Sequence, residues 1–182
     1  MDHSIGGVET SSMARGFDVT DTMLKAAQVR LLLARTVCPG KYVVLVAGEV
    51  GPVAASVRAG AERAADTLVD HFVIPNIHPD VFPAIEGTVQ VTDLGALGIL
   101  ETFSVASLIE VADACAKAAL VRLIEIKLAM AMGGKGLIWF TGDVASVETA
   151  VAAGAACAGE KGLLVQKVVI PQPRPELLRE MI

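Results

Sequence analysis

A single cysteine stands where the chain is expected to turn between two apolar runs. Residues 36–41 read Thr-Val-Cys-Pro-Gly-Lys, so Cys38 is followed by Pro39, which fixes its own backbone φ, and by Gly40, which can adopt a positive φ. The pattern predicts a tight turn with an exposed tip. A thiol is unusual there, because cysteine is ordinarily a buried small residue. One thiol cannot build a metal site, so either several copies of the chain bring Cys38 together or the thiol is incidental.

Few other side chains suggest chemistry. Lys41 follows the turn, and Lys135 holds the matching place later in the chain; each could activate a nearby thiol or simply carry charge at a strand end. Cys115 and Cys157 fall among alanines in helical stretches and are predicted to be packed side chains. The sequence contains no Ser/His/Asp set, no paired carboxylates and no nucleotide fingerprint, so we expect a protein that is not an enzyme.

The composition narrows the class of protein. Of the 182 residues 53% are hydrophobic, but no uninterrupted apolar run approaches the roughly 18 residues of a membrane span. With a net charge of −5, one Trp and no basic run, neither a nucleic acid nor a membrane is an expected partner. The first residues lack a signal-peptide pattern, so we expect a soluble, cytoplasmic chain. Its apolar character favours extensive subunit contacts.

The sequence is a tandem duplication. Residues 5–10 recur as residues 97–102, and residues 21–31 recur as 113–123 with Lys-Ala-Ala-x-Val-Arg-Leu in both copies. The register shifts by two residues near the central turn, after which Gly40-Lys41 matches Gly134-Lys135. We therefore predict one domain over residues 1–78 and another over 95–182, joined by a Pro- and Gly-containing linker over 79–94.

Each repeat predicts the same elements. A strand (4–10; 96–102) leads into a helix, for which Ser104 is the expected cap in the second copy. Two strands follow, of which the later is apolar throughout and therefore central. A second helix, with a buried stripe from Val53 to Leu68 in the first copy, and a final strand complete the repeat. The order β-α-β-β-α-β is the ferredoxin-like split βαβ arrangement, of the mixed α/β (α+β) class.

These repeated motifs resemble the bacterial microcompartment (BMC) shell domain. They are Gly-x-x-Glu-Thr at the opening, Asp-x-x-x-Lys-Ala-Ala-x-Val on the first helix, Gly-[Glu/Asp]-Val after the central strand and Ile-Pro at the close. Two such domains in one chain are similar to the tandem-domain, trimer-forming shell proteins of the propanediol-utilisation type. The resemblance implies a homotrimer that forms a six-sided pseudohexamer and assembles with other shell proteins into a compartment shell.

The resemblance also implies a site. In that family the turn between the second and third strands lines a pore on the symmetry axis. The implied pore-lining residues are Pro39, Gly40, Met132, Gly133 and Gly134. The resemblance further implies that three Cys38 thiols hold one [4Fe–4S] cluster per trimer, with one iron lacking a protein thiolate. Met132 is given no metal role, because a thioether is a weak ligand.

Edge positions follow from the same resemblance. Lys25 and Lys117 match the lysine at which neighbouring tiles meet, although each lies four residues after an aspartate and could be an ordinary surface ion pair worth about 0.3–0.5 kcal/mol. The closing arginine of the family is missing after Ile74-Pro75 and is displaced to Arg174 in the second repeat.

Three functions remain open from the sequence. The leading one is a shell tile whose pore cluster transfers electrons across the shell or is delivered to a redox enzyme inside, which would be a further partner. The second is a shell tile whose pore conducts a small metabolite, with Cys38 incidental. The third is an enzyme or ligand-sensing module with residues 132–136 as a phosphate loop, which the missing GxxxxGK[ST] spacing disfavours.

Overall fold

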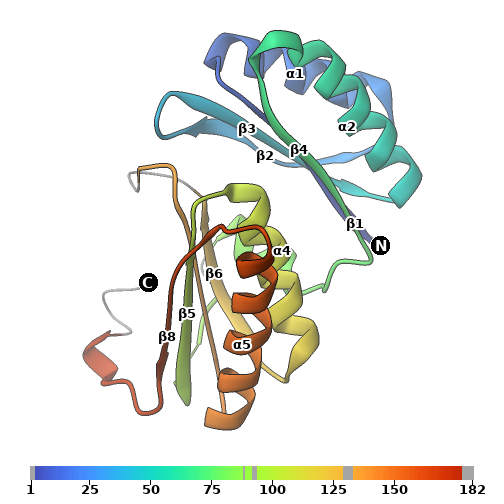
Figure 1. Cartoon of the computed structure of the whole chain (residues 1–182). Coiled ribbons are helices and arrows are strands. Elements are labelled where there is room, and N and C mark those ends of the chain that lie inside the picture. Colours follow the sequence, from blue (N-terminus) through green and yellow to red (C-terminus); the bar gives the residue numbers. More distant parts are fainter. Residues whose placement is uncertain (1–2, 88, 92–93, 129–132, 178–182) are drawn as a thin grey trace. The chain divides into compact units, whose positions relative to one another are not determined.

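The order β-α-β-β-α-β occurs twice along the chain, and the short helix α3 precedes the second copy (Figure 1). The computed structural model describes residues 3–87, 89–91, 94–128 and 133–177. The elements of the first unit are β1 (Ser4–Thr10), α1 (Met13–Ala26), β2 (Arg30–Val37), β3 (Lys41–Gly48), α2 (Val50–Ala64) and β4 (Leu68–Pro75). Those of the second are α3 (Val81–Glu86), β5 (Ala96–Thr102), α4 (Val105–Ala118), β6 (Arg122–Leu128), β7 (Gly136–Gly142), α5 (Val144–Glu160) and β8 (Leu164–Ile170). The two units divide between Ile77 and His78.

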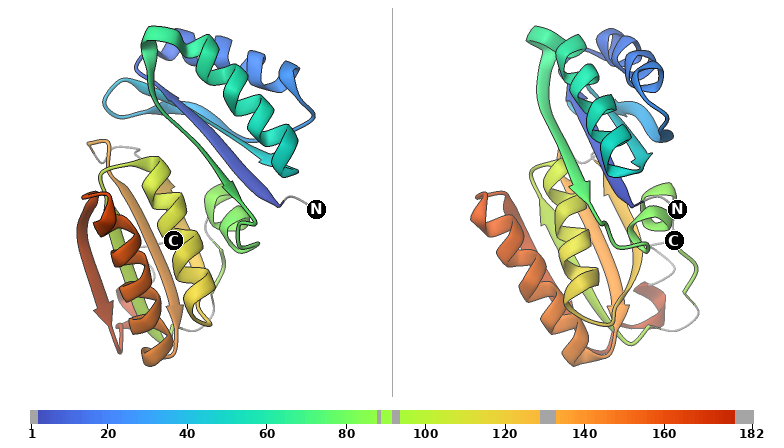
Figure 2. Two further views of the ribbon diagram at one scale, coloured as in Figure 1. Left: turned by 45° about the vertical axis from the view of Figure 1, so that its right-hand side comes forward. Right: turned by 90° about the vertical axis from the view of Figure 1, so that its right-hand side faces the viewer.

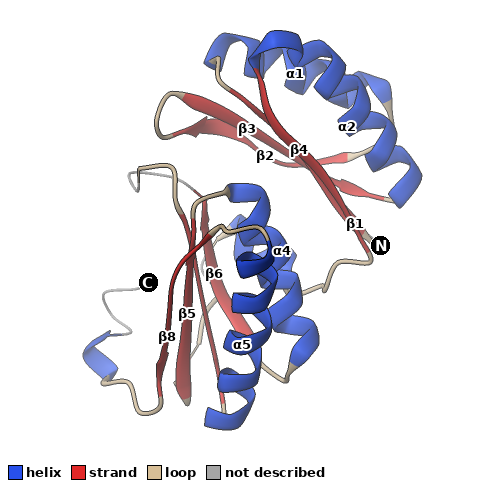
Figure 3. Cartoon of the chain, viewed as in Figure 1, coloured by secondary structure: helices blue, strands red, loops and turns tan. Residues whose placement is uncertain are grey.

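Each unit is an antiparallel sheet with two long helices on one face (Figures 1 and 3). The strand order is β2-β3-β1-β4 in the first unit and β6-β7-β5-β8 in the second, so the apolar strands β3 and β7 lie inside their sheets, as predicted. Helices α1 and α2 run side by side over the first sheet (Figure 2). Because strand side chains alternate between faces, Val8, Val44 and Val46 point to the same side and meet Val19 and Met23 of α1 in a buried cluster.

Short polar residues mark where the first long helix of each unit begins. Ser12 precedes α1 and Ser104 precedes α4, and each hydroxyl oxygen accepts a hydrogen bond of 3.3 Å from the backbone N–H three residues later. The predicted cap at Ser104 is therefore confirmed. The second helix ends earlier than expected: Ala65 has a positive φ of 50°, which interrupts the helix, and Leu68 begins β4.

The stretch 79–94, expected to be a linker, is in large part packed against the second unit. It contains α3, which packs against α4 and β6. The buried residues of α3 are Val81, Ala84 and Ile85. Further on, the Val89 N–H donates to the Ile124 carbonyl of β6 at 2.8 Å, and Val91 is buried with Ile124 and Trp139. The sequence did not indicate this, because a helix of six residues is too short for a periodic pattern.

One helix–sheet contact is filled in opposite ways in the two units. Gly16 of α1 lies so close to Tyr42 of β3 that a Cβ on Gly16 would lie 2.3 Å from the Tyr42 Cγ. In the second unit Leu108 and Gly136 hold the matching positions, and a Cβ on Gly136 would lie 2.7 Å from the Leu108 Cδ2. Each contact therefore joins one large residue to one glycine. The large residue stands on the sheet in the first unit and on the helix in the second.

Candidate functional site

The Cys38 turn joins β2 to β3 at one end of the first sheet. The two strands pair as far as Val37 and Lys41, so only Cys38, Pro39 and Gly40 form the turn. Gly40 has the positive φ expected of it, 73°, and both Pro39 and Gly40 are exposed. The Cys38 thiol is free and half-buried, so it is less exposed than the tip beside it. The structure thus presents one thiol at the end of the sheet.

The lysines beside the two central turns are held by ion pairs. Lys41 Nζ lies 2.7 Å from Glu9 Oε1, and Lys135 Nζ lies 2.8 Å from Glu101 Oε1. Both glutamates belong to the repeated Gly-x-x-Glu-Thr motif on the neighbouring strand, so the contact is duplicated with the repeat. This pairing indicates that the two lysines carry charge at the ends of the strands and do not activate a nearby thiol.

The second central turn joins β6 to β7 and contains no cysteine. Gly133 and Gly134 have positive φ values of 61° and 87°, which favour glycine at both positions. Gly133 is exposed, and Gly134 is half-buried. Met132, the remaining residue expected to line a pore here, lies outside the described residues.

Cys115 and Cys157 differ from Cys38 in their surroundings. Cys115 is fully buried in α4, its Sγ donates a hydrogen bond to the Ala150 carbonyl at 3.2 Å, and burial raises its pKa to about 12. Cys157 is half-buried on α5, and partial burial raises its pKa as well. Both thiols are therefore protonated at neutral pH. The predicted packing is complete for Cys115 and partial for Cys157. Within the described part of one chain, no three His, Cys, Asp or Glu side chains converge as metal ligands.

Lys25 and Lys117 occupy equivalent places but different environments. Each pairs with the aspartate four residues earlier, Lys25 with Asp21 at 2.5 Å and Lys117 with Asp113 at 2.6 Å. The first pair is exposed. In the second, the Asp113 side chain is only 12% exposed, and its other oxygen accepts the His78 N–H at 2.8 Å. Lys117 therefore neutralises a nearly buried carboxylate, whereas Lys25 has a surface partner.

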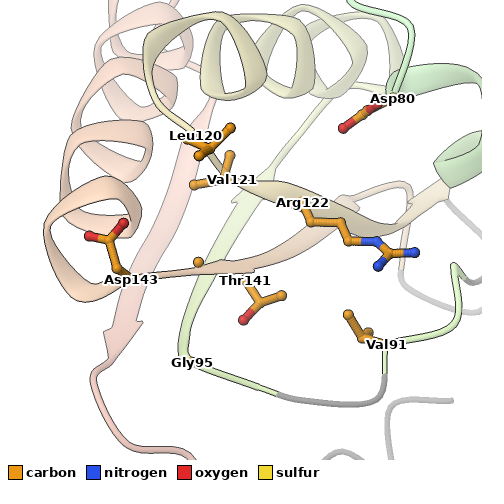
Figure 4. A pocket seen from close by; sticks show the side chains of 9 residues that line it. Asp80, Val91, Gly95, Leu120, Val121, Arg122, Thr141 and Asp143 are labelled. Carbon is orange, nitrogen blue, oxygen red and sulfur yellow. The ribbon is translucent and has the colours of Figure 1, made fainter.

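An open hollow lies at the other end of β6 and β7 from their turn (Figure 4). Its volume is about 640 Å³, and the Arg122 side chain extends between Asp80 and Val91 on its wall. The first unit has a hollow of about 420 Å³ at the matching place, with Arg30 in the position of Arg122. We did not single out these arginines from the sequence, although the aligned Val-Arg-Leu of both repeats contains them.

Comparison with known proteins identifies the family of both units. The BMC domain matches residues 4–77 and again residues 96–173. Bacterial microcompartment shell protein PduT of Citrobacter freundii is 44% identical over 182 residues, which cover 100% of this chain and 99% of that protein. The probable carboxysome shell protein CsoS1E of Prochlorococcus marinus strain MIT 9313 is 41% identical over 88 residues, or 47% of this chain and 43% of that protein.

Solved structures agree with this result. A microcompartment protein from Desulfitobacterium hafniense DCB has a TM-score of 0.95 at 54% identity, covering 98% of this chain and 99% of that one. The fused permuted hexameric shell protein MSM0275 from the RMM microcompartment shares the fold, with a TM-score of 0.62 at 20% identity over 85% of this chain and 84% of that one. In the part of the chain that the structure describes, no helix is long and apolar enough to cross a membrane. The chain belongs to the BMC domain family and is a structural shell protein of a bacterial microcompartment, not an enzyme.

Proposed function

We propose that the chain forms a homotrimeric, pseudohexameric shell tile whose central turns hold a [4Fe–4S] cluster through Cys38 of three subunits. The observation that carries this proposal is the free thiol of Cys38. Both repeats have a central turn, but only the turn of the first repeat contains a cysteine. Three copies of a chain with two similar units make a ring of six units, in which the two kinds of turn alternate around the axis. Such a ring brings three Cys38 residues together.

The residues around Cys38 suit a cluster that is shared between chains. The described residues of one chain offer no group of three ligands, so a metal at Cys38 needs thiols from other copies. A Cβ on Gly40 would meet nothing within 4 Å, so the turn has open space at Gly40. Cysteine thiolates are the usual ligands of iron–sulfur clusters. When bound, the cluster supplies a redox centre that exchanges electrons across the shell, or a cluster for transfer to a redox enzyme inside.

The second candidate is a pore that passes a small metabolite, with Cys38 incidental. Gly133 favours it, because this exposed residue with positive φ presents backbone polar groups without a side chain. The two candidates differ in whether the trimer binds iron.

Wild-type protein prepared and reconstituted without oxygen is expected to be a trimer with about four irons and four sulfides per trimer, and to show the broad visible absorption of thiolate-bound iron. Light scattering measures the oligomeric state, and chemical analysis measures iron and sulfide. A monodisperse monomer or dimer would contradict the ring. A trimer that retains no iron would contradict the cluster and leave the metabolite pore.

We also propose that Lys25 and Lys117 lie at the rim where tiles meet. Changing both to glutamine is expected to leave the trimer intact and to weaken sheet assembly, because the rim loses two cations per chain. Glutamine can still donate a hydrogen bond to Asp113, whose nearly buried carboxylate nevertheless loses its cation, so Lys117→Gln is expected to cost about 1 kcal/mol of stability. Electron microscopy of assembled sheets is the measurement. Unchanged assembly would leave both lysines with only the ion pairs to Asp21 and Asp113 within their own chain.

A further inference from the structure

One side of the first unit is exposed where the matching side of the second unit is buried. We call it the α1–β2 side. Its exposed apolar residues are Met13, Phe17, Leu24 and Leu31. Phe17 is 65% exposed, whereas its equivalent in α4, Ile109, is fully buried. Leu31 on the edge strand β2 is 40% exposed, whereas its equivalent in β6, Leu123, is 1% exposed. The α1–β2 side therefore exposes apolar residues whose equivalents in the second unit are buried.

In the second unit this side is packed by the segment that follows the first repeat. The His78 N–H donates to Asp113 of α4 at 2.8 Å, and α3 then packs against α4 and β6. His78 also orders the start of α3, because its Nδ1 accepts the Asp80 N–H at 3.3 Å. Val81 of α3 is fully buried. The described residues of the first unit include no helix equivalent to α3.

The C-terminal segment repeats the start of the α3 segment. Beginning four residues after the Ile of the closing Ile-Pro in each repeat, residues 78–82 read His-Pro-Asp-Val-Phe and residues 174–178 read Arg-Pro-Glu-Leu-Leu. Both start a helical turn in the same way: the Val81 N–H donates to the His78 carbonyl at 3.1 Å, and the Leu177 N–H donates to the Arg174 carbonyl at 3.0 Å. The C-terminal turn is exposed throughout and lies beyond the edge strand β8, apart from the helices of its own unit (Figure 1, red).

The apolar spacing of the two segments also agrees. Val81, Phe82 and Ile85 stand at the positions of Leu177, Leu178 and Met181. The match to the BMC domain ends at residue 77 in the first repeat and at residue 173 in the second, so both segments lie beyond it. They are therefore a duplicated addition to the two domains. The α3 segment packs on α4 and β6, whereas the described residues of the C-terminal segment, 174–177, are exposed.

We propose that residues 174–182 pack on the α1–β2 side of a second copy of the chain, as the α3 segment packs on α4 and β6. In a ring of alternating units, the segment after each closing strand reaches the next unit. After the first unit the next one belongs to the same chain, and after the second it belongs to the neighbouring chain. This inference rests on the proposed trimer and states which segment joins its subunits.

The chemistry of the two surfaces fits this arrangement. The apolar side chains of the C-terminal segment would cover Phe17 and Leu31. Asp21 of α1 is the equivalent of Asp113, and its carboxylate is exposed. The contact between the His78 N–H and Asp113 therefore predicts a contact between the Arg174 N–H of one chain and Asp21 of the next, with the Arg174 charge beside a carboxylate.

Engineered disulfides test the proposal. Asp21→Cys combined with Arg174→Cys is expected, after mild oxidation, to join chains into covalent trimers on a denaturing gel. The reason is that a backbone nitrogen bonded to an aspartate oxygen leaves the two Cα atoms at roughly the 4.4–6.8 Å of natural disulfides. Both positions are exposed, so the protein is expected to fold. The background carries Cys38→Ser and Cys157→Ser to remove competing thiols.

Two matched pairs complete the design. His78→Cys with Asp113→Cys is the control for a contact within one chain and is expected to give a monomeric, disulfide-closed band. Asp18→Cys with Arg174→Cys is the negative control, because Asp18 faces α2, where Arg63 binds it at 2.8 Å.

The outcomes separate this inference from the proposed tile. A trimer by light scattering that gives no cross-link between Asp21→Cys and Arg174→Cys would overturn the inference alone. A disulfide that closes within one chain would also overturn it. Mixing two differently tagged chains detects this case, because no disulfide then joins one tag to the other. Protein that is not a trimer would overturn both the inference and the proposed tile.

Discussion

Replacing Cys38 with serine is expected to remove all iron from the trimer while leaving the trimer itself unchanged. A serine hydroxyl keeps its proton at neutral pH and is a poor substitute for a thiolate, and the symmetry removes the ligand from every subunit at once. Cys38 lies half-buried in a turn, outside the core, so the free energy of unfolding of the cluster-free protein is expected to change by no more than about 0.5 kcal/mol. Iron analysis and visible spectra after anaerobic reconstitution measure the first effect, and thermal unfolding measures the second.

The other two cysteines provide matched controls for this experiment. Cys157→Ser is expected to keep the iron of the wild type, because Cys157 lies within helix α5 and not in a turn between strands. Cys115→Ala is also expected to keep the iron, although it removes a buried Sγ that donates to the Ala150 carbonyl. If Cys38→Ser trimers bind as much iron as the wild type, the cluster is not at the pore, and the metabolite pore becomes the better function.

Changing Gly16 to leucine is expected to destabilise the first unit by about 3 kcal/mol, because the new side chain enters the space of the Tyr42 ring and overpacks the core. The better helix propensity of leucine offsets only about 0.8 kcal/mol of the cost of the clash. The double variant Gly16→Leu/Tyr42→Gly rebuilds the Leu108–Gly136 contact of the second unit. It is expected to be more stable than Tyr42→Gly alone, which leaves a large cavity.

Urea unfolding followed by far-ultraviolet circular dichroism measures these differences. Gly51→Ala in α2 is the control, because a Cβ there meets nothing within 4 Å and the change is expected to be neutral or stabilising. A Gly16→Leu variant as stable as the wild type, or a double variant whose loss equals the sum of the single losses, would show that the Gly16–Tyr42 contact is not tightly packed.

The order of elements could be predicted because the duplication shows each element twice. Where the first helix is ambiguous in one copy, the other copy supplies the apolar spacing and the Ser104 cap. The turn at Cys38 could also be predicted, because Pro39 fixes its own φ and Gly40 can adopt the positive φ that the turn needs. Local chemistry decides both features, so a single sequence suffices for them.

Features that depend on contacts distant in sequence could not be predicted. Lys41 was expected at a strand end, but its partner Glu9 is specified only by the pairing of β1 with β3. Asp21 and Asp113 look the same in the sequence, yet only Asp113 is nearly buried, because the α3 segment packs beside it. The role of Cys38 depends on other copies of the chain, so neither the sequence nor the fold of one chain decides it.

The opposite filling of the contact at Gly16 affects how a duplicated chain folds. Two similar repeats can exchange elements, so that a helix of one docks on the sheet of the other. Helix α1 on the second sheet would set Gly16 against Gly136 and leave a void, and α4 on the first sheet would drive Leu108 into the Tyr42 ring. Both exchanged forms are penalised, one by missing volume and the other by excess volume. A single pair of positions thus allows each helix to distinguish its own sheet from the copy 92 to 94 residues away in the sequence.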